Sequence, residues 1–320
     1  MRILFHENEL NYRGTSIALY DYADFNERYL GNESVIVYNK TLPTNHPLGI
    51  EKFEKRFQVI GYSDFKEVDT IIKNNNIDLF YAIKNGFYDD IETKECKTVV
   101  HSVFKYFEPH GDVYAYVSQW LSEEMTQGKS PFVPHMVNFE NETHEDLRTE
   151  LQIPKNAKVF GYYGGGQSFN IGFVQKAVEK IASSYKDVYF IFMGVDPFVK
   201  KKWWKSVPPN IKFLPPSSDV LMKLKFINTC NALLHARERG ETFGITVAEF
   251  ALKGKPVITF ADSPEKAHID HLENQAYYYK DAKELKNILL DSDLSLSARE
   301  LYEKFLPNPV MDKFKKVFID

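Results

Sequence analysis

Two carboxylates, Glu241 and Glu249, stand eight residues apart around the start of a predicted helix. The first turn of a helix has free N–H groups and partial positive charge, so it is suited to an anion such as phosphate. A carboxylate farther along can accept hydrogen bonds from hydroxyls, as acidic residues do for ribose in dinucleotide sites. One segment could therefore hold both the charged and the hydroxylated parts of a nucleotide-sugar.

A glycine-rich stretch, residues 161–170, lies between a predicted strand and a predicted helix. Glycines let backbone N–H groups come close to a phosphate, and we expect Gly164 and Gly165 to do this. From this stretch alone, a flexible turn between strand and helix is an equally good interpretation.

Two further candidates lie in the first half of the chain. His101 ends a predicted strand, where an imidazole can hydrogen-bond a sugar hydroxyl or protonate a leaving group. A purely structural histidine fits the same pattern almost as well. Gly14 begins the first predicted helix, and the Thr15 or Ser16 beside it could simply cap that helix.

Two other motifs are less informative. Asp291-Ser-Asp293 has the spacing of a metal-binding carboxylate pair, but it follows a predicted helix, so we interpret it as a loop or cap. The basic stretch Lys200–Lys205 contains two tryptophans that could stack on bases or sugars. Inward packing of those rings is the preferred interpretation in an otherwise acidic chain.

Strand and helix patterns alternate along the chain, which predicts α/β domains with parallel sheets. The alternation breaks near residues 135–150 and then starts again at Val159. We therefore predict two doubly wound Rossmann-like domains facing a cleft, with an acceptor-side domain over residues 1–140 and a donor domain over 141–300. A C-terminal helix over 301–320 is expected to cross back to the first domain.

Composition limits the class of protein. The 320 residues are 43% hydrophobic and 26% charged, with a net charge of −4, as in an ordinary globular protein. The acidic first half disfavours nucleic acid as a partner, and no apolar run reaches membrane-spanning length. Cys96 and Cys230 lack metal-ligand spacing and are expected to be free thiols, which favours a cytoplasmic location.

The segment from Leu234 to Ile258 resembles the E-x7-E region of family 4 glycosyltransferases, which are retaining enzymes of the GT-B fold. The resemblance implies that Glu241 contacts the donor sugar and Glu249 the ribose. It also implies that the Thr242-Phe243-Gly244 turn faces the donor, with the amides of the last two residues toward the diphosphate.

The same resemblance extends to the first half of the chain. His101 matches a histidine that lines the sugar site in many members, and Gly14 matches a glycine that lets the backbone approach donor and acceptor. The chain departs from the family at Tyr162 and Phe169, where typical members have an arginine and a lysine that neutralise the diphosphate.

Arg237 and Arg239 precede Glu241 and are the obvious replacements for those missing cations. An equally good interpretation is a surface loop in which they pair with Glu238.

The expected function is a metal-independent, retaining glycosyltransferase without a cofactor. It would move a sugar from a nucleotide-sugar donor to a carbohydrate or other hydroxyl acceptor. Two alternatives remain open: a catalytically inactive, transferase-like protein that binds a glycan or a partner, and a nucleotide-sugar epimerase of the same fold.

Overall fold

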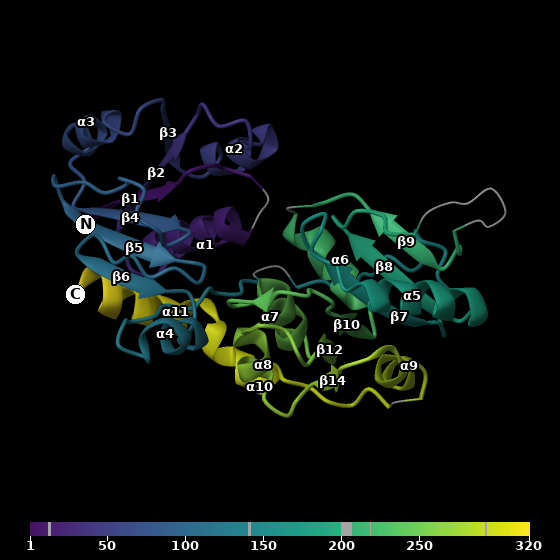
Figure 1. The fold of residues 1–320 in the computed structure, drawn as a ribbon. Coiled ribbons are helices and arrows are strands. Elements are labelled where there is room, and N and C mark those ends of the chain that lie inside the picture. The colour runs from purple at the N-terminus through teal and green to yellow at the C-terminus, as the bar shows by residue number, and fades with distance from the viewer. Residues whose placement is uncertain (12–13, 140–141, 200–206, 218, 292) are drawn as a thin grey trace. The chain divides into compact units, whose positions relative to one another are not determined.

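The computed structural model describes residues 1–11, 14–139, 142–199, 207–217, 219–291 and 293–320. Two compact units divide the chain (Figure 1). Unit 1 comprises Met1–Asn138 and Lys304–Asp320, and unit 2 comprises Phe139–Glu303.

Unit 1 is built on a six-stranded parallel sheet of order β3-β2-β1-β4-β5-β6. Its elements are β1 (Arg2–Glu7), α1 (Gly14–Arg28), β2 (Glu33–Asn39), α2 (Pro47–Glu54), β3 (Gln58–Tyr62), α3 (Glu67–Asn74), β4 (Leu79–Lys84), β5 (Lys97–Ser102), β6 (Val113–Tyr116), α4 (Gln119–Thr126), α11 (Pro307–Phe314) and the π-helix η2 (Lys315–Ile319).

Both faces of this sheet are covered, which explains the apolar runs within its strands. All six residues of β4 are buried. On one face, Phe80 of β4 packs in a cluster with Val68 and Ile72 of α3. On the other face, Tyr81 packs against Phe314 of α11, with ring centroids 5.4 Å apart.

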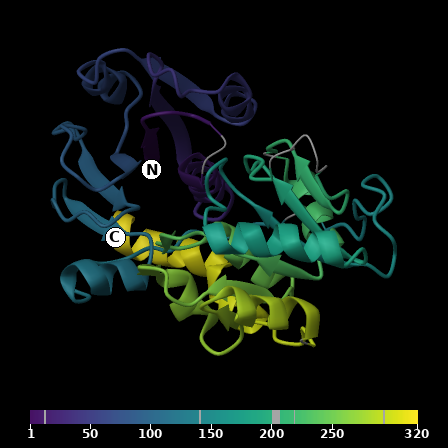
Figure 2. The same ribbon diagram turned by 45° about the vertical axis from the view of Figure 1, so that its right-hand side comes forward.

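The C-terminal segment therefore belongs to the core of unit 1. In Figures 1 and 2 the yellow α11 lies beside the elements of the first half of the chain, and α11 contacts α1 while η2 contacts β6. The Phe318 ring is 5.2 Å from the ring of His101, and the Phe314 ring is 6.3 Å from that of Phe5.

Unit 2 has a second six-stranded parallel sheet, of order β14-β12-β10-β7-β8-β9, and a small two-stranded sheet. Its elements are β7 (Lys158–Tyr163), α5 (Gly172–Ser184), β8 (Val188–Met193), β9 (Ile211–Leu214), α6 (Val220–Thr229), β10 (Ala232–Leu234), β11 (Gly240–Glu241), α7 (Ile245–Leu252), β12 (Val257–Phe260), β13 (Glu265–Lys266), α8 (Ala267–Leu272), β14 (Tyr277–Tyr279), α9 (Ala282–Asp291) and α10 (Arg299–Tyr302); the 3₁₀-helix η1 (Glu303–Phe305) follows.

The prediction of two doubly wound parallel α/β sheets is confirmed. In each sheet the strand order reverses next to the first strand, between β1 and β4 in unit 1 and between β7 and β10 in unit 2. Ligands of open α/β sheets bind outside the carboxyl ends of the strands at such a switch point. In unit 2, this rule predicts a ligand site at the loops after β7 and β10.

Candidate functional site

The loops that follow β7 and β10 meet at the switch point of unit 2. Asn170 closes the glycine-rich loop, and its amide donates to the carbonyl of Ala236 at 3.0 Å. Its side-chain oxygen accepts a hydrogen bond from the amide of Glu238 at 2.8 Å. The hydroxyl of Thr246, in the first turn of α7, donates to the carbonyl of Tyr163 at 3.1 Å. Three separate segments of the sequence thus form one edge.

Glu241 lies at this edge between two donors. Its Oε1 is 3.3 Å from Nε2 of His235, and its Oε2 is 2.7 Å from a guanidinium nitrogen of Arg237. Burial opposes ionisation of Glu241, but the hydrogen bond from His235 and the charge of Arg237 outweigh it and lower its pKa to about 2. Glu241 is therefore a fixed carboxylate near neutral pH.

An ionised carboxylate can only accept hydrogen bonds, and this fixes a chain of polar groups behind Glu241. The proton of His235 is assigned to Nε2, so a neutral His235 accepts at Nδ1 from the hydroxyl of Thr259, 2.9 Å away. That hydroxyl in turn accepts from Nε2 of His268 at 3.2 Å. His235, Thr259 and His268 are all fully buried, so we call these three residues the buried relay.

The relay has one unsatisfied atom within the described part of the chain. Nδ1 of His268 is buried without a hydrogen-bond partner. Burial, followed by the neighbouring His235, holds the pKa of His268 well below its ordinary value. His268 is therefore neutral near pH 7, and the relay holds Glu241 through a chain of hydrogen bonds.

The segment after Glu241 makes a sharp turn into α7. Gly244 precedes the helix with a φ of 92°, a conformation that strains other residues. Gly240 has a φ of 80°, and a side chain there would collide with the carbonyl of Glu265. Phe243 is buried against His271, with ring centroids 5.5 Å apart, while Thr242 is half-buried. The turn thus places the amino end of α7 next to Glu241.

Glu249 lies about one turn along α7 and is 4% exposed. Its two oxygens contact the ammonium of Lys223, from α6, and the hydroxyl of Tyr163, at the end of β7. The side chains of Glu249 and Lys223 are 5% and 10% exposed, so this is a buried ion pair. Sequence reasoning missed Lys223, although a lysine within the largely apolar pattern of α6 was a signal that a buried carboxylate must lie nearby.

The two glycines predicted to approach phosphate have different environments. The amide of Gly164 donates to the carbonyl of Met193 at 3.1 Å, so it is committed to the backbone. Gly165 is exposed, and a side chain at its position would meet nothing within 4 Å. Gly165 is therefore the more open of the two.

Tyr162 and Phe169 both lie in apolar surroundings. Phe169 is 2% exposed, with ring centroids 4.8 Å from Phe192 and 5.3 Å from Phe198. Tyr162 is also 2% exposed and lies beside His235. A charged side chain at either position would be buried beside aromatic rings, which is costly without a partner.

The two predicted replacement arginines pair with different carboxylates. Arg237 pairs with Glu241 and its side chain is 32% exposed. Arg239 pairs with Glu265 at 2.6 Å, and its side chain is 51% exposed. Arg237 is therefore the arginine that pairs with Glu241.

The remaining candidates, His101 and Gly14, lie in unit 1. His101 is fully buried: its Nε2 donates to the carbonyl of Val133 at 2.9 Å, and its Nδ1 accepts from the hydroxyl of Tyr81 at 2.6 Å. Burial lowers the pKa of His101 to about 4. These contacts account for both ring nitrogens and match the structural interpretation of this residue. Gly14 is exposed at the first position of α1.

Two motifs that the sequence offered remain. Asp291 ends α9, and Lys200–Lys205 lies outside the described residues. Over the residues that the structure covers, no group of three or more His, Cys, Asp or Glu side chains is arranged to hold a metal ion. None of the helices there is long and apolar enough to cross a membrane.

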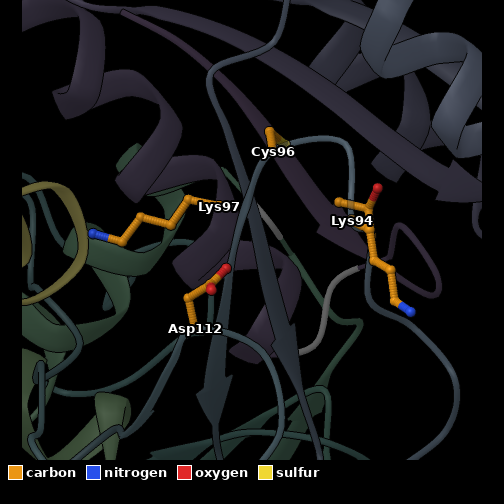
Figure 3. A pocket seen from close by; sticks show the side chains of 5 residues that line it. Lys94, Cys96, Lys97 and Asp112 are labelled. Carbon is orange, nitrogen blue, oxygen red and sulfur yellow. The ribbon is translucent and has the colours of Figure 1, made fainter.

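A surface pocket lies at the amino ends of β5 and β6 in unit 1 (Figure 3). It is lined by Thr93, Lys94, Cys96, Lys97 and Asp112. Asp112 accepts from the amide of Thr98 at 2.7 Å, and Lys97 donates to the carbonyl of Ile319 at 3.3 Å. Burial raises the pKa of Cys96 to about 11, so its thiol is a poor nucleophile. These contacts are structural, and the pocket is a weaker candidate than the edge at Glu241.

Comparison with known proteins supports the fold through structure alone. The amino-acid sequence matches no protein-family model and no curated protein. A glycosyltransferase from Rickettsia africae has a similar structure, with a TM-score of 0.72 at 15% identity over 99% of this chain and 97% of that one. HepE from Anabaena, solved with UDP, gives a TM-score of 0.72 at 15% identity over 99% of both chains.

A third solved structure has the same fold. WaaG, a glycosyltransferase involved in lipopolysaccharide biosynthesis, gives a TM-score of 0.66 at 12% identity over 100% of both chains. Such low identity establishes architecture and not activity. The chain therefore has the GT-B fold of these glycosyltransferases, along its whole length.

Proposed function

We propose that the chain is a metal-independent, retaining glycosyltransferase that moves a sugar from a UDP-linked donor to a hydroxyl acceptor. One observation carries the proposal: Glu241 is an oriented carboxylate paired with Arg237 at the amino end of α7, at the switch point of unit 2. Similar structures hold UDP or UDP-glucose, which supports the choice of donor.

Each group at the edge has a role in this proposal. Glu241 accepts hydrogen bonds from the sugar, and Glu249 accepts from the ribose while Lys223 neutralises it. The amides of Phe243 and Gly244, together with Gly165 and Arg237, stabilise charge on the departing diphosphate, which is catalysis by fixed dipoles and charges. Arg239 lies farther along the same loop and is a secondary cation.

The two candidates in unit 1, His101 and Gly14, differ in the role that we propose for them. We assign no substrate contact to His101, because its ring is buried and both nitrogens are hydrogen-bonded within unit 1. Gly14 retains its predicted role of letting the backbone approach substrate. A cytoplasmic location is part of the same proposal, and it rests on the free thiols of Cys96 and Cys230.

Binding and turnover test the proposal separately. UDP is titrated with and without a chelator, and we expect equal affinity in both; loss of binding on chelation would contradict metal independence. Parent and Arg237→Ala are compared with UDP and with uridine. We expect Arg237→Ala to weaken UDP more than uridine, and an equal effect on the two would remove Arg237 from the diphosphate site.

Turnover is measured with a panel of UDP-sugars and neutral sugar acceptors, and the anomeric configuration of the product is read by NMR. Retention of configuration in the parent and loss of product in Glu241→Gln are expected. An inverted product would exclude the retaining mechanism. UDP binding with no turnover of any donor would favour the inactive binding protein.

An epimerase is the second candidate, because a putative UDP-N-acetylglucosamine 2-epimerase from Listeria monocytogenes has a similar structure, with a TM-score of 0.61 at 12% identity. The transferase is preferred because the transferase structures match more closely. Incubation with UDP-N-acetylglucosamine alone separates the two. Inversion at C2 without an acceptor would establish the epimerase.

A further inference from the structure

The loops that follow β4 and β5 in unit 1 display three exposed aromatic side chains. Tyr88, Tyr106 and Phe107 are 48%, 45% and 49% exposed. Large apolar groups left in water and gathered in one region mark interaction sites more often than chance placement. We call these three residues the aromatic surface.

The two loops form one structure. The amide of Tyr88 in the first loop donates to the carboxylate of Glu108 in the second at 2.8 Å. The Phe87 ring meets the Tyr106 ring edge-on, with centroids 5.4 Å apart, and the Tyr88 ring lies 5.2 Å from that of His110. The loop that carries Tyr88 and the loop that carries Tyr106 and Phe107 are therefore in direct contact.

The backbone below these rings is firmly held. The hydroxyl of Tyr114 donates to the carbonyl of Gly86 at 2.6 Å, and that of Tyr116 donates to the carbonyl of Tyr106 at 2.7 Å. Gly86 has a φ of 111°, and a side chain there would collide with Ser102. Rings presented by a backbone that is already ordered lose little freedom on binding, which favours a recognition surface.

Carboxylates surround the aromatic surface. Asp90 and Glu108 are exposed and Glu92 is half-buried near Tyr88, and two of the cations in this part of the chain are paired. Lys105 pairs with Glu124 at 2.6 Å, and Lys84 is buried against Asp89. An acidic surface repels the phosphates of nucleic acids and anionic lipids, which need clustered Lys and Arg.

Aromatic faces combined with carboxylates match the chemistry of a neutral carbohydrate. The C–H groups of a sugar ring carry partial positive charge and pack on the negative face of an aromatic ring. Sugar hydroxyls donate charge-assisted hydrogen bonds to carboxylates. We propose that the aromatic surface binds a neutral oligosaccharide, and that this oligosaccharide is the acceptor of the reaction. The second part rests on the proposed function, whereas the binding does not.

The experiment measures oligosaccharide binding without any nucleotide. The full chain is applied to an array of neutral oligosaccharides, and the best binder is titrated by calorimetry. Parent, Tyr106→Ala, Phe107→Ala and Phe107→Leu are compared, with Tyr185→Ala as a matched control for an exposed aromatic residue of unit 2. Each loss of a ring is expected to raise Kd at least about five-fold, including in Phe107→Leu, which stays apolar.

Two further measurements make each outcome decisive. UDP affinity is expected to be unchanged in all variants. A failure of the UDP-donor proposal can therefore be distinguished from a failure of the oligosaccharide-binding proposal. Vesicles of equal parts phosphatidylcholine and phosphatidylglycerol are expected not to bind. Absence of neutral glycans that bind the parent, equal binding by the variants, or vesicle binding that Phe107→Ala abolishes would each overturn the proposal.

Discussion

The carboxylate of Glu241 is constrained by two donors that differ in how easily they can move. His235 is fully buried and belongs to the relay, so it holds Oε1 in a fixed direction. Arg237 is 32% exposed at its side chain and can turn toward an incoming anion without leaving the edge. The pair therefore separates orientation, supplied by the histidine, from charge compensation, supplied by the arginine.

Thr259→Val tests the relay. The substitution keeps the shape of the side chain but leaves Nε2 of His268 and Nδ1 of His235 without their shared partner. We expect a loss of about 1–3 kcal/mol in the free energy of unfolding, measured with urea, and a fall in turnover of the UDP-sugar with unchanged UDP affinity. Thr259→Ser keeps the hydroxyl and should restore turnover; no difference between the two variants would argue against the relay.

The buried ion pair of Glu249 and Lys223 leads to a second prediction, which concerns the free energy of unfolding. Removing one partner leaves a buried charge, so Lys223→Met should lower the free energy of unfolding by about 3–5 kcal/mol. The double variant Lys223→Met with Glu249→Gln should recover much of that loss, and urea unfolding measures both.

The affinity for UDP tests whether Glu249 has a role beyond its ion pair with Lys223. Glu249→Ala should weaken UDP about ten- to a hundred-fold if the carboxylate also accepts from ribose, since a charged hydrogen bond contributes about 1.5–3 kcal/mol. A UDP affinity that survives in Glu249→Ala would leave this residue with a structural role only.

Three buried imidazoles make unit 1 sensitive to acid. Burial lowers the pKa of His6 and His135 to about 3 and that of His101 to about 4, whereas an unfolded histidine titrates near 6.5. The unfolded chain therefore binds protons first, so stability present above about pH 6.5 is lost as the pH falls toward 4.

The slope of the free energy of unfolding against pH can be measured. Each neutral imidazole contributes up to about 1.4 kcal/mol per pH unit to the free energy of unfolding in this window. Urea unfolding is measured at several pH values for the parent and for His101→Gln, which should remove one imidazole from the slope. An unchanged slope would mean that His101 titrates normally.

Several candidate residues named from the sequence come from one segment, Arg237 to Gly244, just before α7. Within it Arg237 pairs with Glu241, a contact that the sequence did not predict. Thr259, His268 and Lys223 were missed, because they reach the site from other elements and no local spacing links them to Glu241. His101 illustrates the converse: a position at a strand end was predicted correctly, but only packing reveals that the ring faces the interior.

At the scale of elements, the alternation of strand and helix patterns predicted the two parallel α/β sheets. That alternation does not fix the short elements, such as the helices α2, α4 and α8 and the strand β14. Each has eight or fewer residues, so tertiary packing rather than local preference decides its structure.

α11 shows how a terminal element can complete a core. Phe314 is fully buried, with ring centroids within 6.3 Å of Phe5, Tyr22, Tyr81 and Phe318. Truncating it leaves a cavity among aromatic rings, so Phe314→Ala should cost about 3–5 kcal/mol of unfolding free energy. Leu306→Ala, at a side chain that is 40% exposed, is the control; equal losses in both would contradict a core role for α11.

At the scale of the whole molecule, the two units differ in how the chain forms them. Unit 2 is one continuous segment, whereas unit 1 requires its first 138 residues and its last segment together. Unit 1 therefore cannot be completed until the end of the chain is available. Each unit has its own sheet and its own switch point, so a ligand of one unit can be followed separately from the other.

Hydrogen exchange on the full chain tests where the donor binds. A ligand that binds only the folded state stabilises it by about 2.7 kcal/mol at a hundred times its Kd. If UDP is held by the edge around Glu241, amides of β7, β10 and α7 should gain protection toward this limit. Amides of β1, β4 and β5 should gain little, because they belong to the other unit. Protection that rises mainly in unit 1 would place the nucleotide at the β1–β4 switch point instead, and the assignments of Glu241, Glu249 and Arg237 would all be lost together.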